Sequence, residues 1–330
     1  MRHLVLADYG RQIGVTGNRV VVREGDKTLG EYPLRRLRSI TLAKQGVGLS
    51  SNLVLACANN GISLHFHDFR DQPVVSLHGS QSHAVPKVRR DQFAFSESPQ
   101  AREWSREVIV GKLRNQRATL LYFGKYLKSQ GFDSAESIER TAGILDGMAG
   151  QVSRLGLDRQ WRESLMGLEG IAANHYWSCL RETGLFPESF EGRQGRGAQD
   201  VTNQALNFGY ALLKSALWRC VVNAGLEVYV GCLHTARPGR PALVLDLMEE
   251  YRAWVVDRLV IKMRQDLAAQ SHLNQKLKRR VIKEFHQRLA SSVPYKNKRL
   301  RLESAMQRQV YHLVGHMMEG RRYRSMRFRW

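Results

Sequence analysis

The stretch WSREVIVGKLRNQRATLLYFGKYL, residues 104–127, repeats apolar side chains at spacings of three and four. That period matches the turn of an α-helix and predicts a long amphipathic helix. Segments of the same kind follow it, so residues 101–330 are predicted to be mainly helical. One interruption, GLFPESFEGRQGRGA at 184–198, is rich in glycine and arginine and predicts a mobile loop.

Upstream of this helix the sequence changes to short apolar runs separated by turn residues. The runs are LVLA, QIGVT, RVVVRE, SITLA, ISLHFHD and VVSLHG, with turns at Gly17-Asn18 and Gly25-Asp26. One helix is expected at 51–59, because serines can cap it and Gly61 can end it. A stretch rich in Ser, Pro, His and Arg then shows no sustained period. We therefore predict an α+β protein with a β-rich domain at 1–80, a linker at 81–100 and a helical domain at 101–330.

The charge of the chain indicates the kind of partner. Lys and Arg number 51 against 30 Asp and Glu, which gives a formal net charge of +21. Such an excess of positive charge indicates a polyanionic partner. Since 43% of the residues are hydrophobic, the chain is predicted to be a folded protein rather than a basic disordered tail. The four cysteines are too far apart to predict zinc or a redox dithiol, and no apolar stretch approaches a membrane span. A soluble cytoplasmic protein with no membrane partner is expected.

A first candidate for chemistry is Glu169 in LEGIAANHYWSCL, residues 168–180. On a helix Glu169 shares a face with Ala172, Ala173 and Tyr176, and small neighbours let another element approach closely. A carboxylate on such a face suits a metal site built from several helices. The alternative interpretation is a surface glutamate that makes ordinary capping contacts near a helix start.

A second candidate region is GCLHTARPGRPALVLDLMEEYR, residues 231–252. His234 precedes a stretch rich in Gly and Pro, and Asp246 and Glu249 then share one helix face among apolar residues. A buried carboxylate needs a partner. That partner could be a cation or one of the nearby arginines, Arg237, Arg240 and Arg252. Carboxylates with one imidazole suit Mg²⁺ or Mn²⁺, so the sequence predicts metal-dependent phosphodiester chemistry.

Basic segments in the last third of the chain predict contact to a nucleic-acid backbone. They are KLKRRVIKEFHQR, YKNKRLR and RRYRSMRFRW, at 276–288, 295–301 and 321–330. Such contacts carry little base information, so recognition led by DNA geometry is expected. The glycine-rich loop at 184–198 could wrap phosphates or be an ordinary exposed loop. The candidate DNA-binding residues are Arg193, Arg196, Arg237, Arg240, Arg252, Lys276, Arg279 and Arg280.

Pairs of histidines are weaker signals. His65 and His67 lie on one face of a short strand beside Asp68, where a structural role is favoured over metal binding. His312 and His316 are spaced for one helix face, but no acid accompanies them at a suitable offset. A solvated or core face is therefore favoured for that pair.

Taken together and in this order, several segments resemble the CRISPR-associated integrase family, the endonuclease subunit that inserts new spacers into the repeat array. They are KLRNQR at 112–117, EGIAANHYW at 169–177, DVTNQALNFGYALL at 200–213, GCLHTARPGRPALVLDLMEEYR at 231–252 and VVDRLV at 255–260. The resemblance covers essentially the whole chain. One departure is Ala253, where family members often carry proline, and it concerns helix geometry more than ligation.

The resemblance implies both a fold and a chemistry. It implies a β domain that forms a homodimer, a helical catalytic domain, and assembly with a small ferredoxin-like partner subunit. It places the family's metal ligands on Glu169, His234 and Glu249, with Asp246 as a neighbouring acid that could assist. The implied reaction is attack of a 3′-hydroxyl of a short DNA duplex on a phosphodiester of the repeat. A stand-alone nuclease for branched DNA and a non-catalytic DNA-binding scaffold stay open as alternatives.

Overall fold

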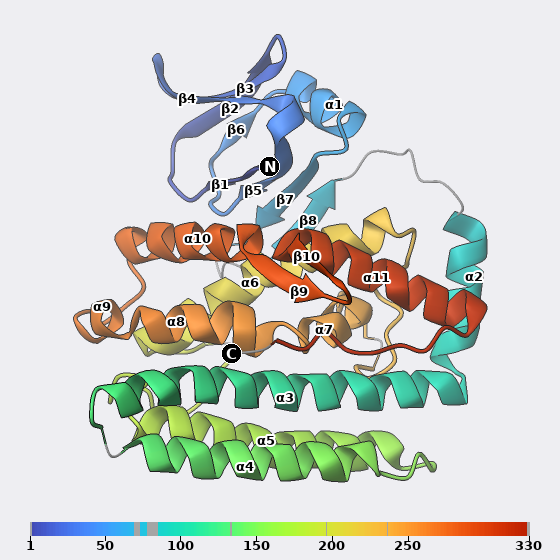
Figure 1. Ribbon diagram of the computed structural model, residues 1–330. Coiled ribbons are helices and arrows are strands. Elements are labelled where there is room, and N and C mark those ends of the chain that lie inside the picture. The colour runs from blue at the N-terminus through green and yellow to red at the C-terminus, as the bar shows by residue number, and fades with distance from the viewer. Residues whose placement is uncertain are drawn as a thin grey trace. The chain divides into compact units, whose positions relative to one another are not determined.

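The computed structural model describes residues 2–68, 73–77, 85–132, 134–195, 197–235 and 237–328. The chain divides into two compact units (Figure 1). Unit 1 comprises residues 1–83 and 274–286, and unit 2 comprises residues 84–273 and 287–330. Strands dominate the first unit and helices the second, so the predicted α+β class is confirmed.

The strands of unit 1 form, in the described residues, two four-stranded sheets. One has the order β1-β5-β7-β8, in which β1, β5 and β7 are parallel and β8 pairs antiparallel with β7. The other has the order β4-β3-β2-β6, with β6 parallel to β2 and the other pairs antiparallel. The bounds are β1 Arg2–Leu6, β2 Arg11–Thr16, β3 Arg19–Glu24, β4 Lys27–Pro33, β5 Leu37–Leu42, β6 Gly48–Leu49, β7 Ser63–His67 and β8 Pro73–Leu77, with the short helix η1 at Leu34–Arg36.

The core of unit 1 is built from buried side chains of its strands and of one helix. Val20 on β3 and Ile40 on β5 are fully buried, and Leu53 of helix α1, Ser51–Asn59, joins the same cluster. Ser50 caps α1, because its hydroxyl accepts a hydrogen bond from the Leu53 N–H at 3.3 Å. Gly61 follows the helix with φ at 63°, a left-handed conformation that glycine adopts without strain. The helix predicted at 51–59 is thus confirmed.

Residues 274–286 belong to unit 1, although the sequence analysis placed them in the helical domain. They make up most of α10, Gln275–Ala290. Gln275 donates to the carbonyl of Ala7, and Nη2 of Arg279 lies 2.7 Å from Oδ1 of Asp8. The ion pair joins positions 271 residues apart, which no local sequence pattern could reveal.

In unit 2 the long helix α3, Pro99–Ser129, packs beside α4 and α5 (Figure 1). The helix predicted from residues 104–127 lies within α3 and is confirmed. Helix α6 is buried along most of its length and packs against α7, η2 and α11. The remaining bounds are α4 Ser134–Ser153, α5 Trp161–Glu182, α6 Val201–Asn223, α7 Ala242–Met248, the π-helical turn η2 Arg252–Asp257, α8 Arg258–Lys262, α9 Arg264–Ala268, β9 Ser292–Tyr295, β10 Lys298–Arg301 and α11 Leu302–Glu319.

The segment predicted to be a linker contains a helix. Helix α2, Val85–Ser96, is part of unit 2. Gln92 is buried, and its Nε2 donates to the carbonyls of Glu227 and Val230, both at 2.8 Å. The weak apolar period hid this helix, because tertiary packing rather than propensity stabilises it. Residues 81–84, at the start of the predicted linker, lie outside the described part of the chain.

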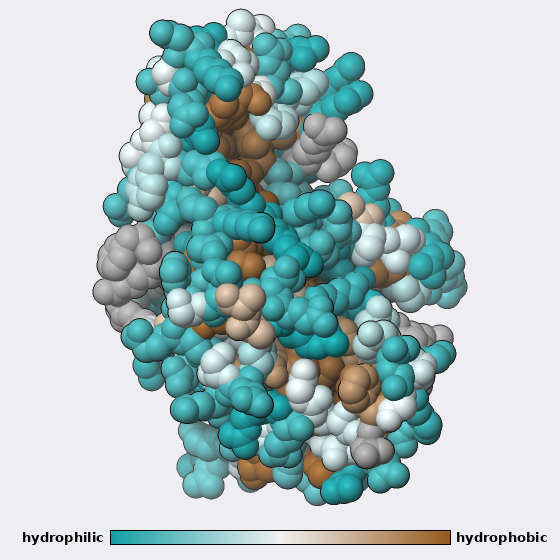
Figure 2. All heavy atoms as spheres, turned by 90° about the vertical axis from the view of Figure 1, so that its left-hand side faces the viewer, coloured by the Kyte–Doolittle hydropathy of each residue, from teal (hydrophilic) through white to brown (hydrophobic). Residues whose placement is uncertain are grey.

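The surface of the described chain is largely hydrophilic on the face shown in Figure 2, where hydrophobic residues form small groups. None of the described helices combines the length and the apolar composition needed to cross a membrane.

Candidate active site

The first predicted ligand, Glu169, lies on α5 and turns toward α3. Its Oε1 is 2.5 Å from the Nζ of Lys112, and both side chains are less than 15% exposed. Ala172 and Tyr176, one and two turns further along α5, are fully buried. The face of small residues predicted around Glu169 therefore does pack against other elements, which brings the carboxylate inside unit 2.

Glu249, directly after α7, contacts the same lysine. Its Oε2 lies 2.6 Å from Nζ of Lys112, and its Oε1 accepts a hydrogen bond from Nε of Arg252 at 2.9 Å. Burial alone would raise the pKa of Glu249, but Arg252, Lys112 and His234 outweigh burial and hold the pKa at about 2. Glu249 is thus ionised in any buffer near neutrality.

His234 is held by the acid that the sequence analysis marked as assisting. Nδ1 of His234 lies 2.6 Å from Oδ1 of Asp246, which is fully buried. The carboxylate of Asp246 also accepts hydrogen bonds from the backbone N–H groups of Cys232, Leu233 and His234 at 2.7, 3.0 and 2.9 Å. Where Asp246 accepts this contact as a carboxylate, Nδ1 of His234 carries a proton, and the neutral form of the ring would then have its lone pair on Nε2, the atom a metal would need.

The chemistry of these side chains, although not their present spacing, suits a hard divalent cation. Oε2 of Glu249 is buried and has no hydrogen-bond partner, since its contact with Lys112 is an ion pair without hydrogen-bond geometry. The Lys112 ammonium contacts one oxygen of each glutamate. A divalent metal ion at the same place would attract both carboxylates in the same way. Burial raises the pKa of the Cys232 thiol well above the usual range, so the thiol is protonated in the metal-free protein. Among the described residues, no three His, Cys, Asp or Glu side chains stand at metal-binding geometry.

Lys112 is the residue of this site whose role the sequence did not predict. Arg252 was predicted to contact DNA or to pair with an acid, and the structure shows the second. Lys112 stands within KLRNQR without an assigned role, although one signal was available. It shares a helix face with Val108, Asn115 and Thr119, all buried, and a lysine on such a face needs an anion.

Arg193 is the predicted DNA contact in the 184–198 loop, whose described residues contain no helix. Its Nη1 and Nη2 donate to the side-chain oxygens of Asn203 and Asn207 at 2.9 and 2.7 Å. The guanidinium also lies 5.2 Å from the ring centroid of Tyr210. Helix α6 thus fixes the base of this loop. Arg196 lies outside the described residues.

The other predicted DNA contacts are at the surface. Arg237 is exposed and forms an isolated β-bridge with Arg240 between His234 and α7. Lys276, Arg279 and Arg280 are exposed on the part of α10 that belongs to unit 1.

His65, His312 and His316 contact polar or aromatic side chains within their own units. His65 is 1% exposed on β7, with Nδ1 2.9 Å from Oγ of Ser76. The ring of His312 stacks on Tyr323 at 5.3 Å between centroids, and the ring of His316 lies 6.0 Å from the same tyrosine. These contacts are those of packed side chains.

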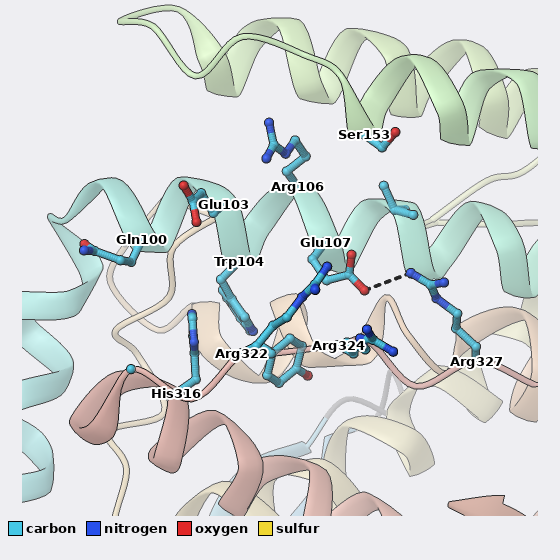
Figure 3. Close-up of a pocket in the computed structure, with 13 residues that line it drawn as sticks. Gln100, Glu103, Trp104, Arg106, Glu107, Ser153, His316, Arg322, Arg324 and Arg327 are labelled. Atoms are coloured by element: carbon cyan, nitrogen blue, oxygen red, sulfur yellow. Dashed lines mark hydrogen bonds and ion pairs between the residues drawn. The ribbon is translucent and has the colours of Figure 1, made fainter. Parts of the chain in front are cut away.

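A cavity of about 870 Å³ lies elsewhere in unit 2 (Figure 3). The first half of α3 lines one side with Glu103, Trp104 and Glu107, and the extended segment after α11 lines the other with Arg322 and Arg324. The predicted ligands Glu169, His234 and Glu249 are not part of its lining.

A strand-rich unit followed by a helical unit with a buried acid, lysine and histidine cluster defines a two-unit α+β protein with a polar site in its helical part. The chain belongs to the Cas1 family, because the family model described as CRISPR associated protein Cas1 matches residues 4–289.

Similar proteins cover the whole chain. CRISPR-associated endonuclease Cas1 1 of Francisella tularensis subsp. novicida is 40% identical over 100% of both chains. A casposase bound to integration product has a TM-score of 0.79 at 20% identity and covers 98% of this chain and 93% of its own. A chain of a Cas6-RT-Cas1–Cas2 complex has a TM-score of 0.76 at 23% identity, over 100% of this chain and 36% of its own. At these identities, the two structures show that the fold is similar and nothing about activity.

Proposed function

We propose that this chain is a metal-dependent DNA nuclease and integrase of CRISPR spacer acquisition, which joins the 3′-hydroxyl ends of short duplex DNA to the repeat array. The observation that carries the proposal is that Glu169 on α5 and Glu249 after α7 both contact the buried ammonium of Lys112, and that His234 is close enough to act on Glu249 electrostatically. The relative named an endonuclease and the casposase bound to integration product support the reaction class.

Each residue of the cluster has a role in this proposal. Glu169, Glu249 and Nε2 of His234 would hold Mg²⁺ or Mn²⁺, which when bound would stabilise negative charge on phosphoryl oxygens. Asp246 keeps the proton on Nδ1 of His234 and holds the loop before α7 in place. Arg252 keeps Glu249 ionised and oriented through a hydrogen bond at 2.9 Å.

DNA and protein partners follow from charge and exposed surface. We propose that the candidate DNA-binding arginines and lysines other than Arg252 neutralise backbone phosphates, in line with the net charge of +21. Unit 1 would form the homodimer, since Val74, Val75 and Leu77 on β8 are 61, 45 and 39% exposed. A small ferredoxin-like subunit is the proposed further partner, by analogy with Cas2 in the similar complex. A cytoplasmic location agrees with a DNA substrate.

The test is strand transfer of a labelled short duplex into a supercoiled plasmid that carries repeats, with Mn²⁺ and the small partner protein. Glu169→Gln and His234→Ala should each lower the rate by at least about 10²-fold, because one ligand is lost in each. Glu163→Gln, an exposed change on the same helix, is the matched control. DNA affinity should stay within about threefold in all three variants. Full activity of either site variant would refute the assignment.

Two further measurements separate the alternatives. A stand-alone nuclease would cut branched DNA but never join the duplex to the plasmid. A DNA-binding scaffold would bind no Mn²⁺ in calorimetry, whereas the proposal requires binding that Glu249→Gln weakens.

A further inference from the structure

Two arginines of unit 2, Arg258 at the start of α8 and Arg288 near the end of α10, lie together on aromatic rings. The Cζ of Arg258 is 3.8 Å from the ring centroid of Tyr122 and 4.3 Å from that of Trp254. The Cζ of Arg288 is 5.1 Å from Trp254 and 6.0 Å from Phe328, whose ring stacks on Trp254. We call this arrangement the Arg258–Arg288 pair.

The pair has no counter-ion in the described part of the chain. In the described residues, no carboxylate lies within ion-pair distance of either guanidinium. Glu284, one turn before Arg288 on α10, does not pair with Arg288 either. The hydrogen-bond partners are neutral, the hydroxyl of Tyr122 for Arg258 and that of Ser291, at 3.3 Å, for Arg288. Nε of Arg258, and Nε and Nη2 of Arg288, are buried without an acceptor.

This arrangement is unfavourable in the protein alone. A partly buried charge without a partner loses hydration, and two like charges repel. Burial, and then the charge of Arg258, lower the pKa of Arg288 to about 9. Cation–π attraction offsets part of this cost, but it would do so equally well for one arginine. The presence of a second guanidinium therefore indicates that this pair binds an anion that the described residues do not supply.

The geometry suits a phosphate group. Aromatic rings cover the faces of the guanidiniums, so only their N–H edges can bind a ligand, and these edges match the paired oxygens of a phosphate. Because three of these nitrogens are buried in the protein alone, the side chains around them would have to shift as the ligand binds. Lys262, one turn after Arg258 on α8, is exposed and adds positive charge. Arg258 also follows Arg252 of the candidate active site by six residues of continuous helical backbone, less than about 10 Å.

We propose that Arg258 and Arg288 together hold one backbone phosphate of the DNA strand that unit 2 binds. The identity of the ligand rests on the proposed function, since it takes DNA as the substrate. Arg258 and Arg288 are positioning residues in this scheme, because they fix the strand next to the glutamate cluster and do not touch the reacting atoms.

The test measures binding of a labelled short DNA duplex with single-stranded 3′ ends, in EDTA and on the full-length Glu169→Gln chain. Arg258→Gln, Arg288→Gln and the double variant should each lower affinity by about tenfold, with the double variant little worse than either single one. The slope of log affinity against log salt should fall by about 0.7 to 0.9, as for one lost phosphate contact. Arg140→Gln, exposed on α4, is the matched control and should change neither quantity measurably.

A substituted DNA strand locates the contact. One neutral methylphosphonate linkage, moved stepwise along the strand, should weaken binding to the parent protein at one position, and the double variant should be insensitive there. Unchanged affinity and slope in the double variant would overturn the proposal. So would a thermal shift with inorganic phosphate that the variants lose while DNA binding is unaffected, because the site would then take free phosphate.

Stability separates a binding role from a structural one. Arg288→Gln removes an uncompensated charge, so without DNA its melting temperature should be no lower than that of the parent chain, and Arg288→Lys should recover the salt slope. A marked loss of stability in Arg288→Gln with an unchanged slope would assign the residue to packing. Because these assays use no metal, a protein that binds as expected yet never joins DNA would refute the proposed function and leave the phosphate site intact.

Discussion

Lys112 is the residue on which the carboxylates of the site depend when no metal is bound. Burial would lower its pKa, but Glu249 and Glu169 outweigh burial and raise it, so the ammonium persists above neutrality. The lysine and a divalent cation are attracted to the same oxygens. In the proposed function, Lys112 would therefore have to withdraw or share its position for an ion to bind.

Replacement of Lys112 tests that competition. Lys112→Met should destabilise the metal-free protein by about 3–5 kcal/mol, because two buried carboxylates lose a partner. Mn²⁺ should then raise the melting temperature of the variant more than that of the parent chain, since no ammonium has to be displaced. Differential scanning fluorimetry in EDTA and in Mn²⁺ measures both. Lys125→Met, exposed on the same helix, is the control, and equal Mn²⁺ shifts in all three proteins would contradict the prediction.

Asp246 shows how far sequence reasoning reaches at this scale. Its spacing of three from Glu249 indicated two acids on one face, one of them partly buried. Its actual partners are the imidazole and backbone of the loop at 232–234, 12 to 14 residues earlier. Loop backbone conformation is set by tertiary folding, so the sequence could suggest the acid but not its role of holding the histidine.

At the scale of elements, the contact of α6 with η2 positions Arg252. A Cβ placed on Gly209 of α6 would lie 2.6 Å from Cγ1 of Val256, closer than real carbon atoms approach. Val256 stands on η2, the same turn that carries Arg252. A glycine is therefore required where these two helices meet.

Alanine at this position should separate the helices. Gly209→Ala should lower the free energy of unfolding by about 1–3 kcal/mol, as for overpacking, despite the better helix propensity of alanine. Gly143→Ala on α4 meets nothing within 4 Å and should instead stabilise by up to about 1 kcal/mol. Urea unfolding of both variants checks the pair. The same sign for both would mean that the α6–η2 contact relaxes without cost.

Glu250 ties the extended segment after α11 to the end of α7. Its carboxyl oxygens accept hydrogen bonds from the hydroxyl of Tyr323, the N–H of Met326 at 2.6 Å and Nε2 of Gln309 at 3.3 Å. Burial raises the pKa of Glu250 to about 8, although Tyr323 and Met326 act to lower it. The folded protein thus keeps a proton that the unfolded chain releases near pH 4.5.

Because of that difference, the free energy of unfolding should fall as the pH rises. A raised carboxyl pKa means that the Glu250 contribution is complete below about pH 4.5 and is lost as pH rises toward 8. The loss is on the order of 3–5 kcal/mol over this window. In Glu250→Gln, the amide oxygen can still accept from Met326 and Gln309, so the decline should flatten. Melting temperatures at pH 5, 6.5 and 8 decide this, and parallel curves for both proteins would contradict it.

For the whole molecule, the sequence predicted an architecture of two parts but not which residues belong to each part. Short apolar runs bounded by turn residues and the helical period of apolar side chains are local patterns, so both units and the 51–59 helix were predictable. Helix α2 and residues 274–286 were misplaced, because each is fixed by contacts to distant segments. The site shows the same contrast between local pattern and tertiary packing. Its acids could be predicted from the segments that contain them, whereas Lys112 contacts them only because α3 packs on α5.

The net charge of +21 makes a prediction for the whole chain. If a protomer contacts 6–10 phosphates, DNA affinity should fall by roughly 10³ to 10⁵ between about 50 and 200 mM salt. Fluorescence anisotropy with a labelled duplex in EDTA measures the slope. Exchange of Lys276, Arg279 and Arg280 for glutamine should lower that slope by up to about 2.7, at 0.9 for each phosphate lost. A slope near zero in the parent chain would show that the excess of basic residues does not bind DNA, and an unchanged slope in the triple variant would place the contacts outside α10.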